Sequence, residues 1–234
     1  MTETTEITNV QESHTLAQEF VLLASGAENN AWKKPRNSYM QTYAAGAILI
    51  ELLSADVIRQ GDENKLEIFL TDYDGDDAAK MMLDKMAQSK PKTMKQWAQS
   101  MFTDRNGRIQ FFQAVVRPIV HSGDLQETND RHLLVPVKRY APSPAAKDRI
   151  IQRIRAELLE KDPVLQQTVL LTMMLEVGGL LKSFFSEDEA RELTKRLKYL
   201  REEPSEKWKQ LVQIHKALKD IHTTIATVTA SSIT

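Results

Sequence analysis

The side chains best suited to hold a metal ion are four aspartates in the segment Asp72-Tyr-Asp74-Gly-Asp76-Asp77. Calcium prefers carboxylate oxygens, and a calcium loop of the EF-hand type needs glycine at its sixth position and glutamate at its twelfth. Here glycine stands fourth and Leu83 stands twelfth. Acidic groups also stabilise the N-terminus of a helix, where backbone N–H groups attract negative charge. We therefore expect helix capping in this segment and no metal site.

The histidines do not form the pair that a zinc site requires. Only His215 and His222 fall on one face of an expected helix, and they lie two turns apart rather than the four residues that suit one zinc ion. The chain has no cysteine, which excludes disulfides, thiolate metal sites and cysteine nucleophiles. It has neither a glycine-rich phosphate loop nor a nucleophile elbow. We expect a protein that is not an enzyme and has no cofactor.

Charge is balanced overall but unevenly placed. The formal net charge is -1, which argues against general binding to nucleic acid, since that requires a strong excess of lysine and arginine. Residues 62–77 hold seven acidic side chains and one lysine, whereas residues 131–155 hold seven basic side chains and one aspartate. Any surface that binds anions must therefore be local.

The basic segment contains a short apolar strip. Leu133, Leu134 and Val135 are followed by Lys138 and Arg139. An exposed hairpin tip of this composition can place its apolar side chains among lipid headgroups while its cations hold anionic lipid. The same pattern fits an edge strand whose apolar face covers the core. The sequence leaves both alternatives open.

A second basic patch lies nearer the N-terminus, in a loop with the sequence Trp32-Lys33-Lys34-Pro-Arg36. A tryptophan beside cations in a loop can sit at a membrane interface or stack on a ligand. It can equally be an ordinary loop anchor.

No segment is expected to cross a membrane. The first 13 residues are polar and acidic, unlike a signal peptide. The most apolar run, residues 164–181, is interrupted by glutamine, glutamate and glycine, so it is expected to form a buried core helix. We expect a cytoplasmic protein that meets a membrane only at its surface.

Apolar residues spaced by three and four predict helices along most of the chain. Alternation with a period of two predicts strands only near residues 57–70 and 133–137. Ser186 and Glu189 match a capping box, and Asp162 with Pro163 is expected to begin the core helix. The predicted fold is mostly α: a compact single-domain multi-helix fold with short β-hairpins, spanning residues 14–222 between flexible ends at 1–13 and 223–234.

Several segments together resemble the Golgi phosphoprotein 3 family. They occur in the family's order from about Leu16 to about Ala217: Leu16-Ala-Gln-Glu-Phe-Val-Leu-Leu-Ala24, Gly46-Ala-Ile-Leu-Ile-Glu-Leu52, Thr93-Met-Lys-Gln-Trp97, His132-Leu-Leu-Val135 and the stretch from Asp162 to Ser186. The resemblance implies a helical peripheral membrane adaptor that binds phosphatidylinositol 4-phosphate in a basic pocket. It also implies a hydrophobic hairpin that inserts into the membrane, self-association through that hairpin, and binding to protein tails.

The same resemblance indicates which residues would bind the lipid headgroup. Trp32 matches the family's pocket tryptophan, and Lys33, Lys34 and Arg36 lie beside it. Two further cations, Arg108 and Arg117, lie close to family arginine positions but out of register. The positions where the family has arginine are occupied here by three uncharged residues: Ala45, Ile109 and Phe112. The alternative function is a soluble protein-interaction scaffold of the same fold that has lost lipid binding.

Overall fold

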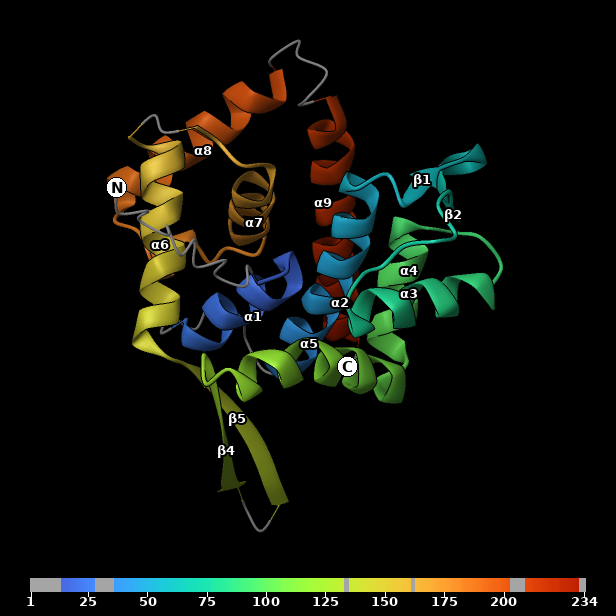
Figure 1. Ribbon diagram of the computed structural model, residues 1–234, viewed down its shortest axis with the longest axis horizontal. Coiled ribbons are helices and arrows are strands. Elements are labelled where there is room, and N and C mark those ends of the chain that lie inside the picture. The colour runs from blue at the N-terminus through green and yellow to red at the C-terminus, as the bar shows by residue number, and fades with distance from the viewer. Residues whose placement is uncertain (1–13, 28–35, 133–134, 161–162, 203–208, 232–234) are drawn as a thin grey trace, which may run out of the picture.

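The computed structural model describes residues 14–27, 36–132, 135–160, 163–202 and 209–231. Over these ranges the chain is mostly helical, as predicted, with two small antiparallel sheets (Figure 1). The helices are α1 (Leu16–Gly26), α2 (Arg36–Ser54), α3 (Asp77–Ala87), α4 (Met94–Thr103), α5 (Arg105–His121), α6 (Pro144–Leu158), α7 (Gln166–Val177), α8 (Glu187–Glu202) and α9 (Lys209–Ser231), with short 3-10 turns η1 (Asp62–Asn64) and η2 (Leu181–Ser183). The strands are β1 (Ile58–Gln60), β2 (Lys65–Ile68), β3 (Lys92–Thr93), β4 (Leu125–His132) and β5 (Val135–Pro142).

Local hydrogen bonds explain where several helices begin. The carboxylate of Asp76 accepts a hydrogen bond from the Ala79 N–H at 2.8 Å and caps α3, which confirms the capping role predicted for this acidic segment. Ser186 and Glu189 form the predicted capping box at the start of α8: each backbone N–H donates to the other residue's side chain. Both arrangements satisfy N–H groups that have no partner within the helix.

The core is one continuous apolar cluster with α2 at its centre. Helix α2 contacts α1, α3, α4, α5 and α9, and Figure 1 shows it surrounded by these helices. Its buried residues include three small ones, Ala44, Ala45 and Ala47, and Tyr43, whose ring stacks on Phe20. Small side chains let neighbouring helices approach closely.

The predicted core helix is confirmed, but its start is not. Every residue of α7 from Thr168 to Leu175 is buried. The helix begins at Gln166 rather than at Pro163, and the N–H of Leu165 donates at 2.8 Å to the carboxylate of Glu157 on α6. A hydrogen bond to the preceding helix, eight residues earlier, is therefore made just before this boundary. Asp162 lies outside the described residues. None of the described helices has both the length and the hydrophobicity to cross a membrane.

The first predicted hairpin is present, and the second is longer than predicted. Strands β1 and β2 pair around η1, and β3 adds a third strand that the sequence did not predict. The second hairpin extends over β4 and β5, from Leu125 to Pro142, well beyond the predicted residues 133–137. Its first strand is rich in polar residues of low strand propensity, so propensity and alternation did not reveal it.

Candidate functional site

The hairpin formed by β4 and β5, called here the long hairpin, projects away from the helical body (Figure 1). It is joined to α5 through Gly123, which has a φ of +81°, a conformation that glycine adopts without strain. At its base Leu125 is buried against the body, and the Ser143 N–H donates to the Asp124 carbonyl oxygen at 2.7 Å. The hairpin is thus anchored at one end only.

The second strand of the long hairpin carries two described cations. Lys138 and Arg139 are both exposed, and Lys138 pairs with Glu127 on the opposite strand at 2.6 Å. Closer to the body, the Tyr140 ring meets Phe112 edge-on at a centroid distance of 5.3 Å. Val135 is the first residue of β5. Leu133 and Leu134 lie outside the described residues, so their predicted role at the tip stays a prediction.

The predicted headgroup pocket lies partly outside the described residues. Trp32, Lys33 and Lys34 belong to the range 28–35, and Arg36 is the first residue of α2. The structure does describe two of the predicted cations, Arg108 and Arg117, both on α5.

Arg108 is a structural residue rather than an open ligand. It is 7% exposed, and its guanidinium donates to the carbonyl oxygen of Phe102. It also donates to the Gln41 Oε1 at 3.2 Å and to the Ser38 Oγ at 3.3 Å, both on α2. Burial lowers the pKa of Arg108 from its ordinary value. This arginine joins α5 to α2 and to the end of α4, and its predicted part in binding a headgroup stays a prediction.

Arg117 does not lie beside Arg108. The two are nine residues apart on one helix, which at about 100° per residue places them on opposite faces. Arg117 is exposed and lines a shallow hollow with Asp77 and Gln110. Of the family's arginine positions, Ala45 and Phe112 are buried in the core and Ile109 is half-buried. These five positions of α2 and α5 therefore do not form a basic pocket.

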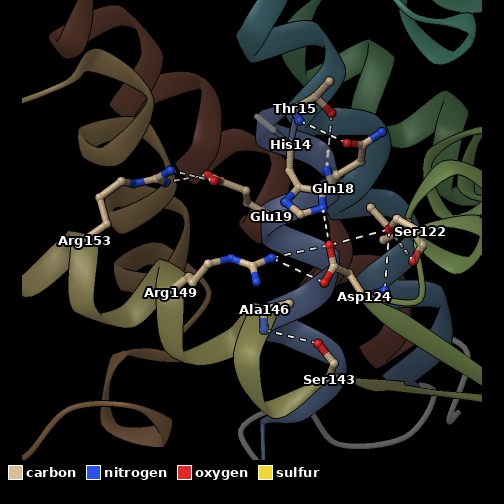
Figure 2. Close-up of polar contacts among 11 residues, drawn as sticks. His14, Thr15, Gln18, Glu19, Ser122, Asp124, Ser143, Ala146, Arg149 and Arg153 are labelled. Carbon is tan, nitrogen blue, oxygen red and sulfur yellow. Dashed lines mark hydrogen bonds and ion pairs between the residues drawn. The ribbon is translucent and has the colours of Figure 1, made fainter. Parts of the chain in front are cut away.

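A different group of charged residues meets at the base of the long hairpin. Asp124 lies between α5 and β4, and its carboxylate contacts the ring of His14 at 3.0 Å. The same carboxylate accepts hydrogen bonds from the Arg149 Nη2 at 3.3 and 3.4 Å. Figure 2 shows two side chains approaching Asp124 from different parts of the fold. His14 precedes α1, and Arg149 lies on α6. These contacts connect the hairpin base to two other parts of the fold.

A second, more buried pair lies beside the first. The Arg153 guanidinium donates to both carboxylate oxygens of Glu19, at 2.7 and 2.6 Å (Figure 2). Burial is the largest influence on the pKa of Arg153 and lowers it, but the hydrogen bond and charge of Glu19 together with Glu157 outweigh burial and raise that pKa. The two pairs border a cavity of about 770 Å³, called here the junction cavity.

The junction cavity does not have the arrangement of a hydrolase triad. Ser122 contacts Asp124 rather than His14, and its hydroxyl also donates to the Ile119 carbonyl oxygen at 3.2 Å. Among the described residues that line the cavity, the one histidine ring contacts Asp124 and makes no hydrogen bond to this hydroxyl. This group of residues was not predicted from the sequence. The only local signal was the spacing of four between Arg149 and Arg153, which places both on one face of a helix.

Comparison with known families assigns this fold. The profile of the family described as Golgi phosphoprotein 3 (GPP34) matches residues 16–221. The chain belongs to the Golgi phosphoprotein 3 family. The match begins at the first residue of α1 and ends within α9. The matched region therefore includes the whole long hairpin and almost all residues that line the junction cavity. A search of curated proteins gave no significant match.

Proposed function

We propose that this Golgi phosphoprotein 3 family member is a peripheral membrane adaptor that docks on the cytosolic face of a membrane through the long hairpin. The observation that carries the proposal is the hairpin itself. It leaves the helical body at one end and presents Lys138 and Arg139 to solvent, and the two leucines of the apolar strip come between its strands in the sequence. Cations beside inserted apolar side chains are the usual means by which a protein holds an anionic lipid surface.

The proposed ligand is anionic lipid, and by family resemblance phosphatidylinositol 4-phosphate. Support for that particular lipid is reduced, because Arg108 is engaged within the protein and Ala45 and Phe112 are buried apolar residues. The remaining candidates are Trp32, Lys33, Lys34 and Arg36, outside or at the edge of the described residues. Attraction to negatively charged lipid in general is the part of the proposal with more support.

A second candidate function is a protein-interaction scaffold that has lost lipid binding. It is favoured by the uncharged residues at the family's arginine positions. It is also favoured by Phe69 and Leu70, which are 54% and 43% exposed beside the acidic segment. Exposed apolar side chains next to a charged surface are a common feature of protein interfaces.

Sedimentation with liposomes distinguishes the two functions. We expect binding to vesicles of phosphatidylcholine with added phosphatidylserine or phosphatidylinositol 4-phosphate, and little binding to phosphatidylcholine alone. Binding should weaken as salt rises, because salt screens the attraction between cations and the surface. Cosedimentation that is absent at every lipid composition would favour the scaffold.

A pair of charge reversals locates the contact. Each cation near an anionic surface contributes about 1 kcal/mol, so Lys138→Glu with Arg139→Glu should weaken vesicle binding at least tenfold. Lys195→Glu with Lys198→Glu is the matched control, since these exposed cations lie on α8, at the end of the molecule away from the hairpin (Figure 1). Equal effects of the two double variants would contradict docking through the hairpin.

A further inference from the structure

We propose that the junction cavity binds a zwitterionic phosphate ester of the phosphoethanolamine type, with the phosphate on Arg149 and the ammonium group on Asp124. The site is separate from the positions where the family resemblance places lipid-binding arginines. That such a headgroup would come from a membrane rests on the docking proposed above; the binding chemistry itself does not.

The inner pair forms a fixed wall of the cavity. Glu19 is 3% exposed at its side chain and binds Arg153 through both carboxylate oxygens. A buried carboxylate with two short charge-assisted hydrogen bonds is costly to separate from its partner. In addition, the Glu157 Oε1 lies 3.9 Å from the Arg153 Nε. A ligand therefore meets this pair as it stands and does not displace it.

The outer pair is open to exchange. One Nη atom of Arg149 is shared between the two oxygens of Asp124 at 3.3 and 3.4 Å, and the Arg149 side chain is 45% exposed. An ion pair with such long contacts and such exposure contributes little to stability, so a ligand can separate it at small cost. A guanidinium has five N–H donors in a planar fork, so Arg149 can take two phosphate oxygens once it turns from Asp124.

Charge balance selects a zwitterion over an anion. The charged residues of the two pairs are Arg149, Arg153, Asp124 and Glu19, so positive and negative charges are equal in number. A phosphate alone would leave the Asp124 carboxylate without its cation, in a partly buried position. An ammonium group on the same ligand replaces that cation, and the His14 ring remains on the other side of the carboxylate at 3.0 Å. Both partners of the broken pair then regain an opposite charge.

The rest of the cavity suits a short linker between two charges. Ile119 and Ile150 line it beside the polar groups, and apolar side chains accommodate the methylene groups of an ethanolamine. Figure 2 shows Arg149 and Arg153 extending from α6 in the same direction, Arg149 toward Asp124 and Arg153 toward Glu19. The cavity lies where the long hairpin joins the body, at the end of the hairpin opposite its tip.

A titration with a soluble headgroup tests the site without any membrane. The full chain is titrated with glycerophosphoethanolamine, followed by calorimetry and by the NMR signals of the His14 ring and arginine side chains. We expect saturable binding that shifts the His14 signals. Glycerol phosphate lacks the ammonium group and glycerophosphocholine lacks its N–H donors, so both should bind at least tenfold more weakly. Equal binding of all three compounds would contradict the zwitterion assignment.

Two substitutions and a control connect binding to the residues named. Arg149→Met and Asp124→Asn should each weaken glycerophosphoethanolamine binding at least tenfold. Arg191→Met removes a similarly exposed arginine from α8, paired with Asp188, and should leave the affinity unchanged. Melting temperatures recorded in parallel show whether each variant is folded. Unchanged affinity in a folded Arg149→Met variant would overturn the proposal.

Vesicles separate this inference from the proposed function. If the soluble headgroup binds but no vesicle does, the site stands and membrane docking fails. The opposite result has two parts: the protein binds anionic vesicles equally with and without phosphatidylethanolamine, and glycerophosphoethanolamine gives neither heat nor an NMR shift. Docking then stands, and the proposed site is refuted. In that case Asp124, His14 and Arg149 serve only to fasten the hairpin to the body.

Discussion

The pair Glu19 and Arg153 is the ionic contact that matters most to stability among those described at the hairpin base. Glu19→Gln leaves the Arg153 guanidinium partly buried with only Glu157 nearby. We expect the free energy of unfolding to fall by about 2–4 kcal/mol, as when one partner of a buried pair is removed. Urea denaturation measures this loss. Asp188→Asn is the control, because its pair with Arg191 is exposed and worth less than about 1 kcal/mol. Equal losses in the two variants would refute the distinction.

Glu51 gives the protein a stability that depends on pH. Burial is the main cause that raises the pKa of Glu51 to about 7 from its ordinary 4.5, and Asp76 and Glu19 add to the rise. Between these values the folded state binds more protons than the unfolded state. The contribution of the protonated carboxyl is therefore complete below pH 4.5 and is lost as pH rises through 7.

The substitution Glu51→Gln tests that sign. Glutamine is neutral at every pH, so the variant should gain stability over the parent as pH rises, by about 1–3 kcal/mol at pH 8. The difference between the two proteins should shrink toward pH 5. Thermal unfolding at a series of pH values measures it. A difference that stays constant from pH 5 to pH 8 would mean that Glu51 has an ordinary pKa.

Single residues were the hardest part of the site to predict. Arg108 has the residue type and approximate position of a headgroup ligand, but the sequence cannot show that Ser38 and Gln41 of α2 and the Phe102 carbonyl oxygen meet its guanidinium. The outer contacts at the hairpin base join residues that are far apart in sequence and form no motif, namely His14, Asp124 and Arg149. Their meeting depends on how α1, α5 and α6 pack.

At the level of elements, the contact between α2 and α9 depends on a glycine. A Cβ atom built on Gly46 would lie 2.7 Å from the Cδ1 of Ile221, a side chain that is 1% exposed. Gly46→Ala should therefore destabilise the protein by about 1–2 kcal/mol, since overpacking outweighs the gain in helix propensity.

A double-mutant cycle isolates that contact. Ile221→Val removes the Cδ1 atom and alone costs about 0.5–1.5 kcal/mol. The double variant should lose at least about 1 kcal/mol less than the sum of the single losses, because the atom that clashes is gone. Urea denaturation of all four proteins gives the coupling. Additive losses would show that Ile221 moves aside without cost.

Elements with their own local signals were predicted well. The caps at Asp76 and Ser186 and the hairpin around η1 depend on neighbours within a few residues, so the sequence shows them. Strand β3 has two residues and exists because β2 pairs with it. Strand β4 is rich in polar residues. It is a strand because it pairs with β5, and not because it is buried. Elements of this kind depend on partners that periodicity does not identify.

At the scale of the whole molecule, a helical body carries one projecting hairpin. The mostly α fold followed from apolar periodicity, and the family followed from the order of several segments, now matched over residues 16–221. The placement of the hairpin could not be predicted in the same way. It depends on Gly123 and on the contacts of Asp124 at the base, which direct β4 away from α5.

The central claim is that the tip of the long hairpin contacts the membrane, and Leu133→Asp with Leu134→Asp tests it most directly. Each buried leucine contributes about 1.5–3 kcal/mol, so binding to anionic vesicles should fall more than tenfold while the melting temperature stays unchanged. Phe69→Asp with Leu70→Asp is the matched control, since it replaces two exposed apolar side chains outside the long hairpin, and it should keep vesicle binding. A collapsed melting temperature in the Leu133 and Leu134 variant, or vesicle binding equal to that of the parent, would contradict the account.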